Sequence, residues 1–89
     1  MNNFYVYIHR KKSNNEIFYV GKGKGKRAYE TYSRNRYWTF TYKKYGRIVE
    51  ILKDNLSENE AFNLEMETIK EYKKQNINLF KYIIFDLLL

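Results

Sequence analysis

One glutamate occupies a position where a helix normally carries an apolar residue. A capping box of the S-x-x-E type stands at Ser57–Glu60 and predicts a helix that runs to about Lys74. On that helix Glu65 lies at the centre of the apolar stripe, with the charged residues on the opposite side. An unpaired carboxylate is costly there, so it needs a cation, a metal ion or a route to water. A buried ion pair and a helix that lines an open cleft both remain structural explanations.

A second candidate for chemistry is the segment 21–27, where three glycines alternate with cations (Gly21-Lys22-Gly23-Lys24-Gly25-Lys26-Arg27). So many glycines predict a loop and not the interior of a strand. The spacing fits neither the Walker A pattern G-x-x-x-x-G-K-[ST] nor the dinucleotide pattern G-x-G-x-x-G. Four cations on a flexible backbone could still hold a phosphodiester through charge and exposed N–H groups. A merely solvated basic loop is the alternative.

Tyrosines supply the third candidate. Residues 4–10 predict a strand in which Tyr5, Tyr7 and His9 share one face. Because His9 ends that strand outside any motif, we expect it at the surface.

Residues 17–20 predict a second strand, joined to the first by a turn over residues 11–16 to form an antiparallel hairpin. A hairpin centred near Ser13 would place Tyr7 beside Tyr19 on one face. Paired tyrosines are most often the half-buried face of a sheet, and this explanation also remains open.

The remaining elements complete a small fold. Residues 28–31 predict a short helical turn, and residues 37–45 predict a helix that Gly46 ends. Residues 48–52 predict a third strand. This order of elements predicts an α+β fold with a three-stranded antiparallel sheet flanked by helices.

Composition limits the classes of function. Eighty-nine residues predict one small domain, and 17 Lys+Arg against 10 Asp+Glu give a formal charge of +7. Aromatic residues make up 19 % of the chain, too many for a disordered basic tail. The absence of cysteine excludes a disulfide scaffold and a cysteine-ligated zinc site. We therefore expect a soluble cytoplasmic protein, for which nucleic acid is the natural polyanionic partner.

Taken together, the motifs resemble those of the GIY-YIG nuclease family. The first motif stands as Tyr5-Val6-Tyr7 and the second, about a dozen residues later, as Tyr19-Val20-Gly21. The glycine–lysine segment then resembles the loop that leads to the family's catalytic arginine, here Arg27. The helix around Glu65 resembles the one that carries its metal-binding glutamate, and Asn78 falls where the family often has an asparagine.

The resemblance implies a metal-dependent DNA endonuclease that uses one divalent cation, Mg²⁺ or Mn²⁺. Glu65 would ligate the metal, and Arg27 would stabilise charge on the scissile phosphate. Tyr7 or Tyr19 would position or deprotonate the attacking water, with help from Lys22. The resemblance and the basic loop together indicate the following residues for substrate binding: Gly21, Lys24, Lys26, Tyr32 and Asn78.

The chain departs from the family pattern at three places. Tyr5 replaces the first glycine of the leading motif, and Thr31 stands where many members carry His or Tyr, although the adjacent Tyr32 could substitute. The third departure is the apolar tail of residues 80–89, which is either a last element covering the sheet or the product of a truncated or shifted reading frame. The nuclease-like domain would cover residues 1–79.

Two other classes of function compete with the nuclease. The chain could be a basic nucleic-acid-binding module without chemistry, or a truncated inactive nuclease remnant. A membrane-peripheral protein is the third class, but we expect no membrane partner. Because 89 residues leave no room for a separate DNA-reading domain, we expect weak site preference, a homodimer, or an additional DNA-binding domain or partner protein.

Overall fold

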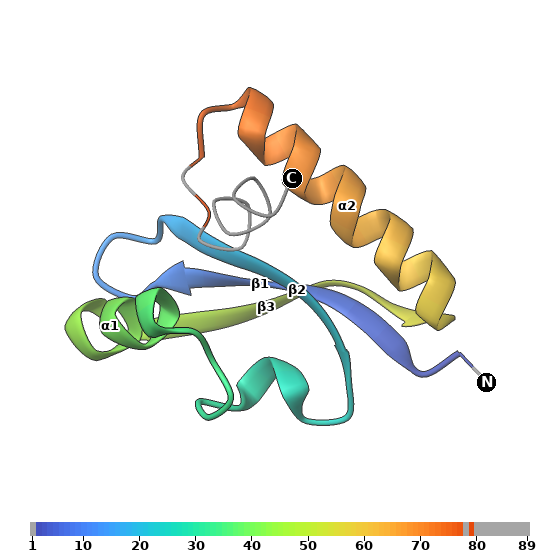
Figure 1. Ribbon diagram of the computed structural model, residues 1–89, viewed down its shortest axis with the longest axis horizontal. Helices are drawn as coiled ribbons and strands as arrows, with labels where there is room; N and C mark the ends of the chain where they lie inside the picture. Colours follow the sequence, from blue (N-terminus) through green and yellow to red (C-terminus); the bar gives the residue numbers. More distant parts are fainter. Residues whose placement is uncertain (1, 78, 80–89) are drawn as a thin grey trace.

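The computed structural model describes residues 2–77 and residue 79, and over these residues the protein has an α+β architecture (Figure 1). The elements follow one another in this order: β1 (Phe4–Lys11), β2 (Ile17–Lys24), the 3-10 turn η1 (Arg27–Tyr29), α1 (Arg36–Tyr45), β3 (Arg47–Leu56) and α2 (Glu58–Lys74). The α+β class and the three-stranded antiparallel sheet predicted from the sequence are confirmed. The predictions for Asn78 and for the tail 80–89 fall outside the described residues.

β1 is the central strand of the sheet, whose order is β2-β1-β3. The turn between β1 and β2 is closed by a bond from the Lys11 amide to the Glu16 carbonyl, and Asn15 takes a φ of 67°. Asparagine tolerates this left-handed conformation better than most residues, which explains its place in the turn. β3 is longer than the predicted strand over residues 48–52 and pairs along nearly the whole of β1.

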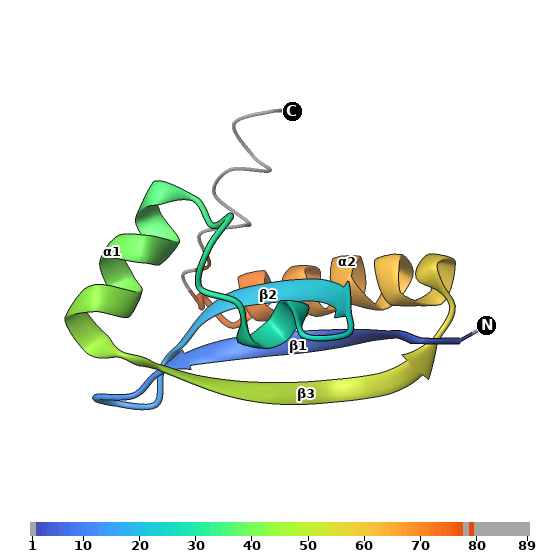
Figure 2. The same cartoon turned by 90° about the horizontal axis from the view of Figure 1, so that it is seen from below.

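The alternation of side chains along β1 gives the sheet two different faces. Val6 and Ile8 point to an aliphatic core that α2 covers. Tyr5 and Tyr7 point to the opposite face, where they pack around Ala28 of η1. Figures 1 and 2 show α2 on one side of the sheet and η1 on the other. We call these the aliphatic face and the aromatic face.

The prediction that residues 21–27 form a loop is wrong for the first part of the segment, because β2 continues through Lys24. Gly21 pairs with Tyr7 and Gly23 pairs with Tyr5 on the neighbouring strand. Glycine weakens a strand unless something approaches its backbone closely. Here the approaching groups are side chains of the aromatic face, as the site geometry makes clear.

α2 begins and ends as the sequence predicts, and α1 begins at Arg36, one residue earlier than predicted. Ser57 caps α2 with a complete capping box, in which the Ser57 and Glu60 side chains bond each other's backbone amides. Asn35 caps α1 by accepting a bond from the Trp38 amide, and Gly46 ends α1 with a φ of 72°. In the part of the chain that the structure describes, neither helix has the length and apolarity that crossing a membrane requires.

Candidate functional site

The Tyr5 hydroxyl fixes the backbone that leads into η1. Its oxygen donates a hydrogen bond to the Gly25 carbonyl and accepts one from the Ala28 amide, both at 2.9 Å. Gly25 itself turns the chain with a φ of 60°. The two bonds hold the residues on either side of Arg27, so that this arginine starts from a defined position on the aromatic face.

Two glycines of β2 leave room for the side chains that carry the site. A Cβ atom on Gly21 would lie 2.6 Å from the Cζ and Oη atoms of Tyr7, far inside a normal contact. A Cβ on Gly23 would lie 2.8 Å from the Cβ of Arg27. Gly21 and Gly23 therefore accommodate Tyr7 and Arg27. In the described structure they are part of the sheet and do not form a phosphate-cradling loop.

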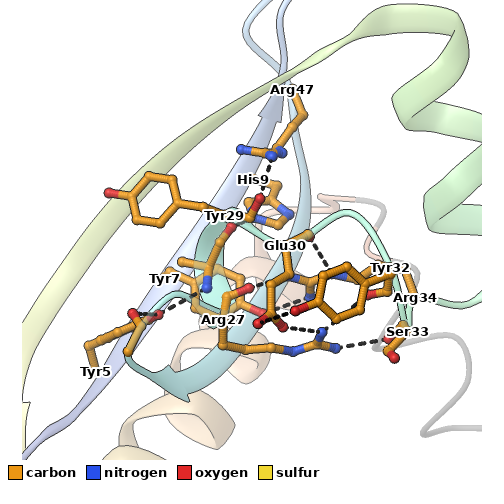
Figure 3. Close-up of polar contacts among 12 residues, drawn as sticks. Tyr5, Tyr7, His9, Arg27, Tyr29, Glu30, Tyr32, Ser33, Arg34 and Arg47 are labelled. Atoms are coloured by element: carbon orange, nitrogen blue, oxygen red, sulfur yellow. Dashed lines mark hydrogen bonds and ion pairs between the residues drawn. The ribbon is translucent and has the colours of Figure 1, made fainter.

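Arg34, in the segment between η1 and α1, contacts several residues of the aromatic face (Figure 3). Its Nη1 donates to the Tyr7 hydroxyl at 2.8 Å, and its Nη2 donates to the Arg27 carbonyl at 2.6 Å. Its Nε donates to the Glu30 carbonyl at 3.1 Å. The guanidinium carbon also lies 5.5 Å from the ring centroid of Tyr19, within the range of a cation–π contact.

Arg27 is held by a second set of bonds. Its Nη1 donates to the Glu30 carboxylate at 3.1 Å and to the Tyr32 carbonyl at 3.3 Å, and its Nη2 donates to the Ser33 carbonyl at 2.9 Å. The Tyr32 hydroxyl donates to the other Glu30 oxygen at 2.9 Å. Figure 3 shows Arg27 and Tyr32 close to Glu30. Tyr32 therefore lies beside Arg27, where it would have to lie to substitute for the His or Tyr that many family members carry at the position of Thr31.

The phenols of Tyr7 and Tyr19 lie on the same face, with ring centroids 6.1 Å apart. They are not directly opposite, because a bulge between His9 and Arg10 shifts the register and pairs Tyr19 with His9. Burial, and secondarily the neighbouring phenol of Tyr19, raise the pKa of Tyr7, while the bond from Arg34 opposes this rise. We call Tyr7, Tyr19, Arg27 and Arg34 the arginine–tyrosine cluster.

The prediction that His9 is a surface residue is wrong. The side chain is fully buried, and its Nδ1 accepts a bond from the Trp38 indole Nε1–H at 2.9 Å. Because Trp38 can only donate, the Nε2 of a neutral His9 carries the proton and donates to the Ala28 carbonyl at 2.7 Å. Burial lowers the pKa of His9 to about 4. The residue thus joins α1, β1 and η1, a role that no local pattern around it indicates.

The lysines of the glycine–lysine segment do not join the cluster. Lys22 and Lys24 alternate onto the opposite side of β2, where each ammonium lies within 5.5 Å of the Phe4 ring centroid. Lys22 also forms an ion pair with Glu58 at the start of α2, at 3.1 Å. Lys26 is exposed in the turn before η1.

Glu65 lies on the other side of the sheet from the cluster. Its side chain is 2 % exposed and lies on the buried stripe of α2, between Ala61 and Ile69. Those two residues pack with Val6 and Val20 on the aliphatic face. Tyr7, Arg27 and Glu65 therefore do not converge in one cleft, and the sheet separates the carboxylate from both arginines.

The described surroundings of Glu65 provide few further ligands for the metal ion that the resemblance implies. Among residues 2–77 and 79, no three His, Asp or Glu side chains gather closely enough to hold a metal ion. Around Glu65 the helix presents Ala61 and Ile69, which offer no oxygen ligand from their side chains. The described residues therefore do not fit a Mg²⁺ or Mn²⁺ ion shared between Glu65 and a phosphate at Arg27.

Two residues of the site escape the sequence reasoning. Glu30 follows Arg27 at a spacing of three, which is a usable signal for an ion pair on one helical turn. Arg34 gives no such signal, because its position depends on the irregular backbone between η1 and α1. Ser33 contributes to that irregularity with a φ of 55°.

Comparison with known proteins found no relative: the chain matches no protein-family model, no curated protein and no solved structure.

Proposed function

We propose that this protein binds DNA at the arginine–tyrosine cluster and hydrolyses a phosphodiester bond there, as an endonuclease of the cell interior. The observation that supports the proposal best is the bond of 2.8 Å from Arg34 to the Tyr7 hydroxyl. Arg34 at the same time bonds the backbone of Arg27. A phenol bonded to one guanidinium, which also fixes the backbone of a second arginine, is an arrangement suited to a phosphate and an attacking water.

The two arginines would divide the work. Arg27 uses three of the five N–H donors of its guanidinium in the bonds to Glu30, Tyr32 and Ser33. Two donors are left for phosphate oxygens, where they would stabilise the negative charge that grows during hydrolysis. Arg34, with bonds to Tyr7 and two carbonyls, would fix the geometry of the cluster.

Tyr7 would orient the attacking water and not deprotonate it. Its raised pKa keeps the phenol protonated near neutral pH. Because its oxygen already accepts a bond from Arg34, its own O–H is the group that remains to donate to a water or a phosphate oxygen. A divalent cation would supply Lewis-acid chemistry if bound, but we assign it no ligand among the described residues.

The second candidate is a DNA-binding module without catalysis, and the position of Glu65 favours it. The resemblance to GIY-YIG nucleases needs a carboxylate near the arginine, whereas Glu65 lies across the sheet from Arg27. Glu30 is close to Arg27, but its carboxylate is already bonded to Arg27 and Tyr32. Both candidates share the same DNA-binding face.

Nicking of supercoiled plasmid separates the two candidates. We expect the wild type to nick DNA with Mg²⁺ or Mn²⁺ and not with a chelator, and we expect Arg27→Ala and Arg34→Ala to be slower by roughly 100-fold. Lys70→Met is the matched control, because it removes one positive charge from the exposed side of α2. It should nick at the wild-type rate.

Three outcomes would count against the proposal. Binding without nicking would establish the second candidate. Equal nicking by all variants would exclude the cluster as the active site. Loss of nicking in Glu65→Gln, in a protein that is folded and still binds DNA, would restore the metal role of Glu65 and contradict the separation seen across the sheet.

A further inference from the structure

The exposed aromatic rings of this protein are concentrated in one segment. Four aromatic side chains between residues 29 and 40 are at least 58 % exposed, namely Tyr29, Tyr32, Tyr37 and Phe40. Elsewhere in the described residues, the one large aromatic with comparable exposure is Phe62, on α2. Two of the four, Tyr37 and Phe40, are three residues apart on α1 and therefore project from one side of that helix. Neighbouring exposed rings of this kind are a feature of binding surfaces.

α1 is also positively charged. It contains three Lys or Arg (Arg36, Lys43 and Lys44) and no Asp or Glu, for a formal charge of +3. Two of these cations, Lys43 and Lys44, lie in the last turn of α1. The ammonium of Lys44 lies 5.9 Å from the centroid of the Phe40 ring, so that a ring and a cation stand side by side on the helix.

α1 presents these groups on a firmly held helix. Trp38 and Thr41 are its buried residues, and the Trp38 indole is bonded to His9 of the central strand. On the outer side, Tyr37, Phe40 and Lys44 follow one another at helical spacing. We call this outer side, together with Lys43, the outer face of α1. Because the inner side is anchored, the outer face can offer its rings with little loss of conformational entropy on binding.

We propose that the outer face of α1 binds the unpaired bases of single-stranded DNA. Every base has a π-face that can stack on an aromatic ring, and such stacking contributes about 1–3 kcal/mol per base. The lysines beside the rings would neutralise the backbone phosphates. In a duplex the bases stack on each other, so the rings would gain nothing from it. The proposal rests on the proposed function and goes beyond it by naming the form of DNA that is bound.

Charge also decides between this ligand and a second copy of the chain. Two copies that met through the outer face of α1 would bring together two helices of formal charge +3, neither of which contains an acidic residue. Like charges in an interface oppose association. A polyanion with flat apolar groups satisfies both the cations and the rings, whereas another copy satisfies only the rings.

The test compares binding to one single strand of about 16 nucleotides and to the duplex of the same sequence. Fluorescence anisotropy in chelator and moderate salt measures binding without cleavage. We expect the wild type to bind the single strand more tightly than the duplex. Phe40→Ala should weaken single-strand binding by about 5- to 100-fold and leave duplex binding unchanged. Phe62→Ala, on α2, is the matched control and should change neither.

Each other outcome overturns the inference. Equal affinity for the two forms, or equal losses in Phe40→Ala and Phe62→Ala, would exclude a stacking role for this face. A membrane surface would be the ligand instead if the protein bound vesicles that contain phosphatidylserine more tightly than the single strand. In that case Phe40→Ala would weaken vesicle binding and leave single-strand binding unchanged. Failure to bind either form of DNA would overturn the proposed function as well, whereas indifference to strand form would overturn this inference alone. Circular dichroism confirms that each variant is folded.

Discussion

The two faces of the sheet share one strand, β1, yet they are stabilised in different ways. On the aliphatic face, Val6 and Ile8 pack against α2 through apolar contacts alone. On the aromatic face, Tyr5, Tyr7 and His9 are also buried, but each makes a hydrogen bond to a residue outside the sheet. At these positions of β1, one face therefore depends on buried area, while the other depends on a set of hydrogen bonds with defined directions.

This difference explains which face can carry a site. Apolar packing tolerates changes of shape as long as volume is kept, so it positions no particular atom. Directed bonds fix individual atoms, as the bond from Arg34 fixes the Tyr7 hydroxyl. The aromatic face also loses stability when a hydrogen-bonded group changes its protonation state. The aliphatic contacts of Val6 and Ile8 contain no group that titrates. The largest difference between the two faces is therefore expected in their response to pH.

Acid should destabilise the protein through His9. Burial lowers its pKa from 6.5 to about 4 in the folded state, so the unfolded chain takes up the proton first as the pH falls. The stability that His9 contributes is complete above pH 6.5 and is lost progressively as the pH falls towards 4. The shift corresponds to about 3 kcal/mol in all, of which about 2 kcal/mol is lost by pH 5. Urea unfolding at pH 7 and pH 5 measures the difference.

The loss of stability between pH 7 and pH 5 can be assigned to His9, because it is the one histidine of the chain. We expect His9→Gln to show little change in the free energy of unfolding between pH 7 and pH 5, even though it is less stable at both. If Gln cannot fold, the wild type alone decides, since equal stability at the two pH values would contradict a buried neutral His9 bonded to Trp38.

The sequence predicts the aliphatic side of this comparison more fully than the aromatic side. Periodicity places Glu65 on the buried stripe of α2, and the S-x-x-E motif places a capping box at the start of that helix. Both predictions are confirmed. Such features depend on residues a few positions apart. Strand alternation places His9 on the face of Tyr5 and Tyr7. Its hydrogen bond, however, joins it to Trp38, which is 29 positions away, so no local pattern could reveal that partner.

Glycine marks the other limit of sequence reasoning. Gly21 and Gly23 predict a loop by their type alone, whereas the structure places them in β2 because neighbouring side chains occupy the space of their missing Cβ atoms. The approach of Tyr7 and Arg27 is a tertiary contact that the glycines do not encode. Tyr7 and Tyr19 lie on one face as the sequence predicts, but the bulge at the end of the hairpin shifts the register, so that Tyr19 pairs with His9.

The second largest effect should come from filling the space at Gly21. A Cβ there would lie 2.6 Å from the phenol of Tyr7, and overpacking of this kind costs about 1–3 kcal/mol. We expect Gly21→Ala to lose that much stability, measured by urea unfolding, and to disturb the bond between Tyr7 and Arg34. A Tyr7→Leu background removes the contact at 2.6 Å and leaves the tight contact of 3.0 Å with the Tyr19 ring, so the same substitution should cost less. Additive costs in the double variant would contradict the contact.

The smallest effect should come from Lys22, the predicted site residue that the structure places on the other side of β2. Its ion pair with Glu58 is near the surface, and such pairs contribute less than about 1 kcal/mol. Lys22→Met keeps the apolar stem beside Phe4, so its loss of stability in urea unfolding should stay below that value. DNA affinity should fall less than in Arg34→Met, which removes the same charge from the aromatic face. If the two variants lost equal affinity, the two faces would not be separate in DNA binding, and the lysines of β2 would have to be counted with the cluster.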